Sequence, residues 1–174
     1  MISQEIAAKM LQIPKKVYEK DTHLDSYDVK YGNVMRFRIP MASLPNFEYK
    51  FFLEVKQSER NRLKITLHFQ DHKASPNLLR IDYGGIHVNP EIANEYVTEQ
   101  FLKYKAKEFS KNEPHIHYYI QGHDLDWALP LLDDDFPIKT ITCEEDKIAA
   151  VMAMCKKVNL QTMLEFQEQM ELIV

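Results

Sequence analysis

Histidines in the second half of the chain are the residues best suited to chemistry, and four of them form a loose group: His87, His115, His117 and His123. His115 and His117 are one residue apart, so on a β-strand their imidazoles share one face, about 7 Å apart along the chain. Imidazole titrates near neutral pH and binds transition metals. We therefore predict that His115 and His117 act as a catalytic acid–base pair or as metal ligands. We expect them on the wetter face of a strand that also carries Tyr119, or in a cleft beneath a loop.

The same group of four is the predicted metal site, with His87, His115, His117 and His123 as ligands of Zn²⁺ or Fe²⁺ if the fold brings them together. Asp124 and Asp126 lie close to His123 and could orient an imidazole. No other cofactor is expected, because the glycine-rich phosphate-binding motifs are absent. The alternative, in which these histidines are dispersed and each is hydrogen-bonded separately, stays open.

A second candidate site is a basic surface. Residues 34–80 contain nine Lys/Arg and four Asp/Glu, whereas residues 121–174 contain four and eleven. Such a basic region could bind RNA or an acidic protein, and it could equally be the ordinary wet face of a sheet. The residues predicted to bind the partner are Arg36, Arg38, Arg62, Lys64, Arg80 and Tyr119.

The elements that carry these residues are mainly strands. Apolar and polar residues alternate through 49–55 and 63–69, which indicates half-buried strands. The short polar link 57–61 between them predicts an antiparallel hairpin. Further strands are predicted at 34–39, 78–83 and 115–120. We expect an α+β fold in which an antiparallel meander sheet of about four to six strands packs against N-terminal and C-terminal helices.

Four helices are predicted from caps and spacing. The first follows Ser3 and ends before Pro14, and the second begins at Asn89-Pro90 and continues to Tyr104. The third starts at a capping box formed by Thr142 and Glu145. The fourth runs from Asn159 towards Leu172. The polar segment 20–33 is expected to be a loop or a frayed extended segment.

Length and composition limit the class of protein. A chain of 174 residues with 45% hydrophobic residues predicts a single domain, 1–174, that needs no disulfide or metal to fold. No signal peptide or membrane-spanning run is found, so we expect a cytoplasmic protein without a membrane partner. The net charge of −4 gives no overall footprint for nucleic acid. The oligomeric state is not indicated.

Several short motifs together are similar to a family of small bacterial and phage proteins classed as a domain of unknown function. They are a GxHxNP motif at 85–90, a PHxHY motif at 114–118 and the segment Trp127-Ala-Leu-Pro130. The resemblance covers roughly residues 50–165 and implies no activity. It implies a prokaryotic or mobile-element setting, in which toxins, antidotes and defence inhibitors are frequent.

Three hypotheses for the function follow. The first is an interaction protein of the defence, anti-defence or toxin–antitoxin kind that binds protein or RNA. The second is a metal-independent ribonuclease that uses His115 and His117, with Arg80 or Arg36 on the phosphate. The third is a metal-binding protein whose ligands are histidines.

Overall fold

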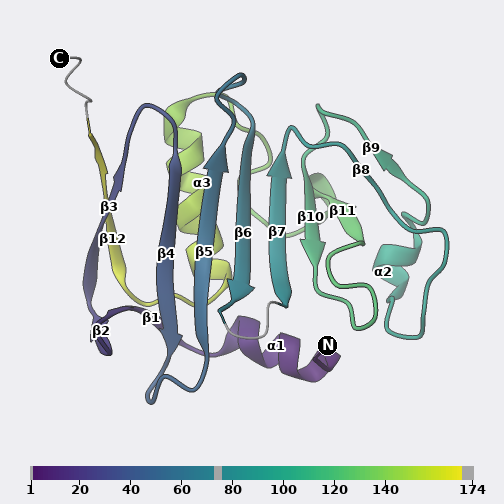
Figure 1. Cartoon of the computed structure of the whole chain (residues 1–174). Helices are drawn as coiled ribbons and strands as arrows, with labels where there is room; N and C mark the ends of the chain where they lie inside the picture. The colour runs from purple at the N-terminus through teal and green to yellow at the C-terminus, as the bar shows by residue number, and fades with distance from the viewer. Residues whose placement is uncertain (1, 73–75, 170–174) are drawn as a thin grey trace.

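The structure is a computed structural model, and it describes residues 2–72 and 76–169. Its main sheet has eight strands in the order β11-β10-β7-β6-β5-β4-β1-β2, and every neighbouring pair is antiparallel (Figure 1). The strands are β1 Lys15–Glu19, β2 Thr22–Leu24, β4 Arg36–Ser43, β5 Lys50–Gln57, β6 Ile65–Asp71, β7 Asn77–Tyr83, β10 His115–Tyr118 and β11 Ala128–Pro130. The predicted α+β class is confirmed, and the sheet is larger than the four to six strands expected.

Smaller elements surround this sheet. Strand β3, Ser26–Tyr31, pairs in parallel with β12, Met163–Glu168, and β8, His87–Val88, pairs with β9, Glu108–Phe109. The helices are α1 Gln4–Gln12, α2 Glu99–Leu102, the single 3₁₀ turn η1 Leu131–Asp133 and α3 Glu144–Lys157. None of the helices in the described ranges is long and apolar enough to cross a membrane.

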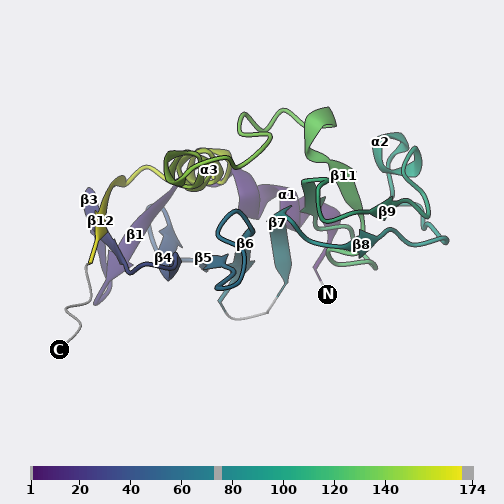
Figure 2. The ribbon, with the colours of Figure 1, turned by 90° about the horizontal axis from the view of Figure 1, so that it is seen from above.

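The predicted meander is formed by β4, β5, β6 and β7, which follow one another in both sequence and space. Alternation in β5 and β6 places Leu53, Val55, Leu67 and Phe69 on one face, and all four are fully buried. Helix α3 packs on this face and adds Val151 and other apolar side chains to the core (Figure 2). The opposite face of the meander therefore carries the polar residues of each strand.

The first and third predicted helices are confirmed. The Ser3 side chain caps α1 by accepting from the backbone N–H of Ile6 at 3.2 Å. Helix α3 begins one residue later than the predicted capping box implies, with Cys143 at the N-cap. The carboxylate of Asp146, rather than that of Glu145, accepts from the backbone N–H groups of Thr142 and Cys143.

The predicted fourth helix is wrong. Asn159 has a positive φ of 59° and ends α3, as asparagine often does in the left-handed conformation after a helix. The chain then forms β12, where Leu164 is buried and Met163 is 62% exposed. A short apolar run fits a helical or a strand period about equally well, and pairing with β3 decides between them here. Leu172 lies outside the described residues.

Two further predictions are corrected. Residues 20–33 contain β2 and β3, so of the two predicted forms the loop is wrong and the extended segment agrees with the structure, here as paired strands. The helix predicted from Asn89 to Tyr104 is reduced to the four residues of α2. Asn89 does not cap a helix, since its side chain is buried and bonded to distant backbone groups.

Candidate functional site

Two rows of polar side chains cross the face of the sheet opposite α3. Cross-strand partners in an antiparallel sheet share a face, so the register alone defines each row. The first polar row contains Arg38, Glu54, His68, Arg80 and His117. The second polar row contains Arg36, Lys56, Thr66, Asp82 and His115. Both rows end in a histidine on β10.

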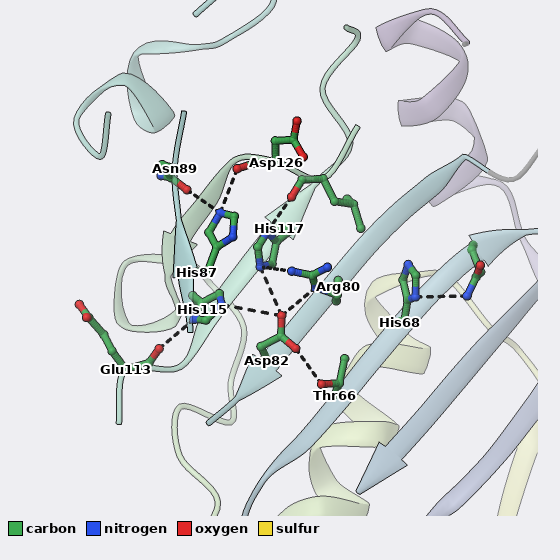
Figure 3. A network of polar contacts seen from close by, with 12 residues as sticks. Thr66, His68, Arg80, Asp82, His87, Asn89, Glu113, His115, His117 and Asp126 are labelled. Atoms are coloured by element: carbon green, nitrogen blue, oxygen red, sulfur yellow. Dashed lines mark hydrogen bonds and ion pairs between the residues drawn. The ribbon is translucent and has the colours of Figure 1, made fainter. Parts of the chain in front are cut away.

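The β10 end of the rows is covered, whereas the β4 end is open. His87 of β8 lies against both histidines, with ring centroids 5.8 Å from His115 and 4.5 Å from His117 (Figure 3). The ring of Phe109 on β9 lies 4.7 Å from that of His115. This cover leaves His115 1% and His117 0% exposed. Of the two predicted placements, the wet face is therefore wrong, and the position beneath a covering segment agrees with the structure.

Asp82 is the centre of the covered cluster. Its Oδ1 accepts from the Thr66 hydroxyl at 2.7 Å, and its Oδ2 accepts from Arg80 Nε at 2.7 Å. The same Oδ2 lies 3.3 Å from His117 Nε2 and 3.7 Å from His115 Nε2 (Figure 3). One carboxylate oxygen is therefore shared by one guanidinium and two imidazoles.

The hydrogen-bond partners fix the tautomers of both imidazoles. Nδ1 of His115 lies 2.9 Å from the carbonyl oxygen of Glu113, and Nδ1 of His117 lies 2.8 Å from that of Leu125. A carbonyl only accepts, so each Nδ1 carries the proton and each Nε2 presents a lone pair. The lone pair of His117 accepts from Arg80 at 2.9 Å, whereas Nε2 of His115 is buried and finds no hydrogen-bond donor among the residues that the structure describes.

Burial and neighbouring groups set the charge states. Burial lowers the pKa of His117 to about 4, and it lowers the pKa values of His115 and His87 as well. Burial opposes ionisation of Asp82, but the charge and hydrogen bond of the Arg80 guanidinium and the hydrogen bond from the Thr66 hydroxyl outweigh it and hold the pKa of this carboxyl well below its usual range. At neutral pH the cluster thus contains a carboxylate and neutral imidazoles, the forms in which these groups bind metals.

Asp82, His115 and His117 have the spacing of metal ligands, because one atom from each lies within 4.8 Å of the others. Bonds of about 2.0–2.1 Å in a tetrahedral site separate ligand atoms by roughly 3.3 Å. The two Nε2-to-Oδ2 distances, 3.3 and 3.7 Å, are close to this value. Each imidazole is also oriented by a carbonyl at its other nitrogen, as is usual for histidine ligands.

His87 belongs to the cluster but is held differently. Its Nε2 lies 3.1 Å from Asn89 Oδ1 and 2.9 Å from the carbonyl of Asp126, so this nitrogen donates and is not free to bind a metal. Asn89 is 2% exposed and bonds to Tyr104 and Ala128 through its amide. These contacts fix the segment that covers the two β10 histidines.

The remaining predicted residues are dispersed. His123 packs edge-on against Trp127, and the group that could hold a metal does not include it. Tyr119 follows the end of β10 and is 4% exposed, so it does not lie on a wet face, and its hydroxyl donates to the carbonyl of Ile2. Arg62 and Lys64 are exposed in the β5–β6 connection rather than on a strand.

Arg36, Arg38 and Arg80 do lie on one face, as the alternation predicts, but each is paired with an acid. Arg36 lies 3.6 Å from Glu59, and Arg38 lies 2.7 Å from Glu54. Arg80 alone reaches the covered cluster, and its side chain is 32% exposed. It therefore lies between the buried histidines and the open part of the sheet face.

Asp82 and Asn89 are the important residues that sequence reasoning missed. Asp82 follows Arg80 at strand spacing, so the alternation already places both on one face. Asp82 and Arg80 contact His115 and His117 only because β7 pairs with β10, and these two strands are separated by more than thirty residues in the sequence. No pattern within either strand specifies that pairing.

The fold and the site define an α+β protein with a buried Asp–His–His cluster at one end of an open polar sheet face. The chain belongs to the family described as "Family of unknown function (DUF6978)", whose model matches residues 2–160. The resemblance to a family of unknown function is thereby confirmed, and the match starts much nearer the N-terminus than residue 50. No curated protein and no solved structure shows a significant match to this chain.

Proposed function

We propose that this protein binds one divalent transition-metal ion through Asp82 Oδ2, His115 Nε2 and His117 Nε2. The observation that carries the proposal is the buried Nε2 of His115, which lies 3.7 Å from Asp82 Oδ2 and has no hydrogen-bond partner within residues 2–72 and 76–169. A buried acceptor without a donor costs about 1–3 kcal/mol, and a metal ion would remove that cost.

The ligand set indicates which ions fit. Two imidazole nitrogens and one carboxylate oxygen suit Zn²⁺ and Fe²⁺, and three protein ligands leave a coordination position for water or substrate. That arrangement is typical of catalytic sites, whereas structural zinc sites have four protein ligands. The proposal keeps two of the four histidines expected from the sequence and replaces the others with Asp82.

The other two hypotheses have less support. Binding of protein or RNA, including a defence or toxin–antitoxin role, stays a prediction, and Arg36 and Arg38, expected to contribute, are in ion pairs. A metal-independent ribonuclease needs its acid and base to reach the substrate. The side chains of His115 and His117 are almost fully buried, and each already uses Nδ1 for a carbonyl.

The test is metal content. Tag-free protein would be incubated with Zn²⁺, freed of unbound ion by gel filtration and analysed by mass spectrometry for zinc per chain. We expect about one ion per wild-type chain and a loss of that ion in His115→Phe, in which a ring of similar size retains the packing on Phe109. His123→Asn is the matched control and should keep the ion. Equal zinc in wild type and His115→Phe would refute the proposal.

A further inference from the structure

Arg80 occupies the place of a cation in the proposed metal site. Its Nε donates to Asp82 Oδ2 at 2.7 Å, and a terminal nitrogen lies 2.9 Å from His117 Nε2. These two acceptor atoms are the ones that a metal ion would bind. Arg80 and the metal therefore compete for the same lone pairs.

The outcome of this competition depends on burial. Asp82 and His117 each have contacts with several groups (Figure 3). The Arg80 side chain, by contrast, is 32% exposed. A divalent ion repels the guanidinium and removes its acceptors, so Arg80 must turn outward. A planar guanidinium a few ångströms from a metal is an effective clamp for an oxyanion.

The charges around this opening also favour an anion. Arg38 and Lys56 both pair with Glu54, at 2.7 and 2.6 Å, which leaves one positive charge in excess. Arg80 balances Asp82, so the bound ion would add two further positive charges. An open face with such an excess of positive charge attracts negatively charged ligands.

We infer that the metal centre takes a phosphoryl-bearing ligand, with Arg80 as its second anchor. The inference rests on the proposed metal site, because without the ion Arg80 stays on Asp82 and His117. In the metal-free protein Arg80 bonds to Asp82 Oδ2 and His117 Nε2. In the complex it bonds to the phosphoryl oxygens instead.

The test is thermodynamic coupling between metal and oxyanion. Zn²⁺ affinity would be measured by calorimetry with and without phenylphosphonate, and with benzoate as the planar carboxylate comparison. We expect phenylphosphonate to tighten zinc binding by about tenfold in the wild type, which is within the usual range of coupling between sites. In Arg80→Gln the coupling should fall well below the wild-type value, because only the direct bond between phosphonate and ion remains, while zinc itself binds at least as tightly because its competitor is gone. Arg62→Gln, which removes the same charge from the exposed β5–β6 connection, away from the cluster and from Glu54, should keep the coupling.

The outcomes separate the two proposals. If the wild type binds no zinc, the proposed function fails. If zinc binds but phenylphosphonate has no effect, or has the same effect in Arg80→Gln, the metal site stands and the role of Arg80 is overturned. If benzoate alone tightens zinc binding, the phosphoryl assignment is overturned.

Discussion

Replacing Asp82 by Asn removes one proposed ligand with almost no change of shape. Loss of a residue that only orients a ligand commonly weakens metal binding by about 10–100-fold, so loss of a charged ligand should weaken it by at least about 100-fold. Without metal the variant should still fold, because its amide oxygen can accept from Thr66. The lost charge-assisted hydrogen bond from Arg80 to the 11%-exposed carboxylate costs about 1.5–3 kcal/mol, which is less than the roughly 5–15 kcal/mol that stabilises a typical folded domain.

The expected size of the effect follows from linkage. At a free Zn²⁺ concentration about 100 times the wild-type dissociation constant, binding stabilises the folded state by about 2.7 kcal/mol. In a chain of 174 residues this raises Tm by roughly 5–11 °C. At the same concentration a variant with 100-fold weaker binding gains only about 0.4 kcal/mol, or roughly 1 °C.

The assay is thermal unfolding followed by circular dichroism, with chelator and with Zn²⁺, for wild type, Asp82→Asn and the control His123→Asn. The control should shift as the wild type does. A zinc-induced shift in Asp82→Asn equal to that of the wild type would refute the assignment of Asp82 as a ligand.

Three further predictions concern stability. In the metal-free protein, kept so by a chelator, the pKa of His117 is about 4 in the folded state and near 6.5 in the unfolded state. Between these pH values the folded state binds fewer protons, so the free energy of unfolding falls as the pH is lowered from about 6.5 to 4. Urea unfolding should show that His117 accounts for about 3 kcal/mol of this pH-dependent decrease, and in His117→Asn the decrease should be smaller by that amount. Gly122→Ala places a Cβ 2.6 Å from Asn94 Nδ2 at a φ of +88°, and we expect it to lower the free energy of unfolding by about 1–2 kcal/mol. At Gly32 a Cβ meets no described atom within 4 Å outside the neighbouring residues, so Gly32→Ala should lower it by less than about 0.5 kcal/mol. Asn89→Asp directs a carboxylate oxygen at two buried carbonyls and should lower the unfolding free energy by about 3 kcal/mol or more, and an unchanged midpoint would contradict the role of Asn89 in holding the cover.

The part of the fold that sequence predicted is the part that local pattern determines. Leu53 and Val55 alternate with polar residues in β5, and the same pattern in β6 gave the hairpin and its buried face. The cap of α1 at Ser3 is equally local. Such features need no knowledge of distant residues.

The errors arose where distant residues decide the structure. Strand β12 exists because β3 offers it a partner, and Asn89 leaves helix geometry because distant carbonyls take its amide. The same holds for the candidate site. The spacing of His115 and His117, two positions apart on one strand, predicted that they act together. Asp82 joins them only through the pairing of β7 with β10, and their burial only through β8 and β9.

The most direct test of the metal site is a crystal structure of the protein with Zn²⁺, with data collected at the zinc absorption edge. The account predicts one anomalous peak about 2.0–2.2 Å from His115 Nε2, His117 Nε2 and a carboxylate oxygen of Asp82, with Arg80 turned away from His117. A peak at another place, or Arg80 still bonded to His117 with no peak between the three ligands, would contradict it.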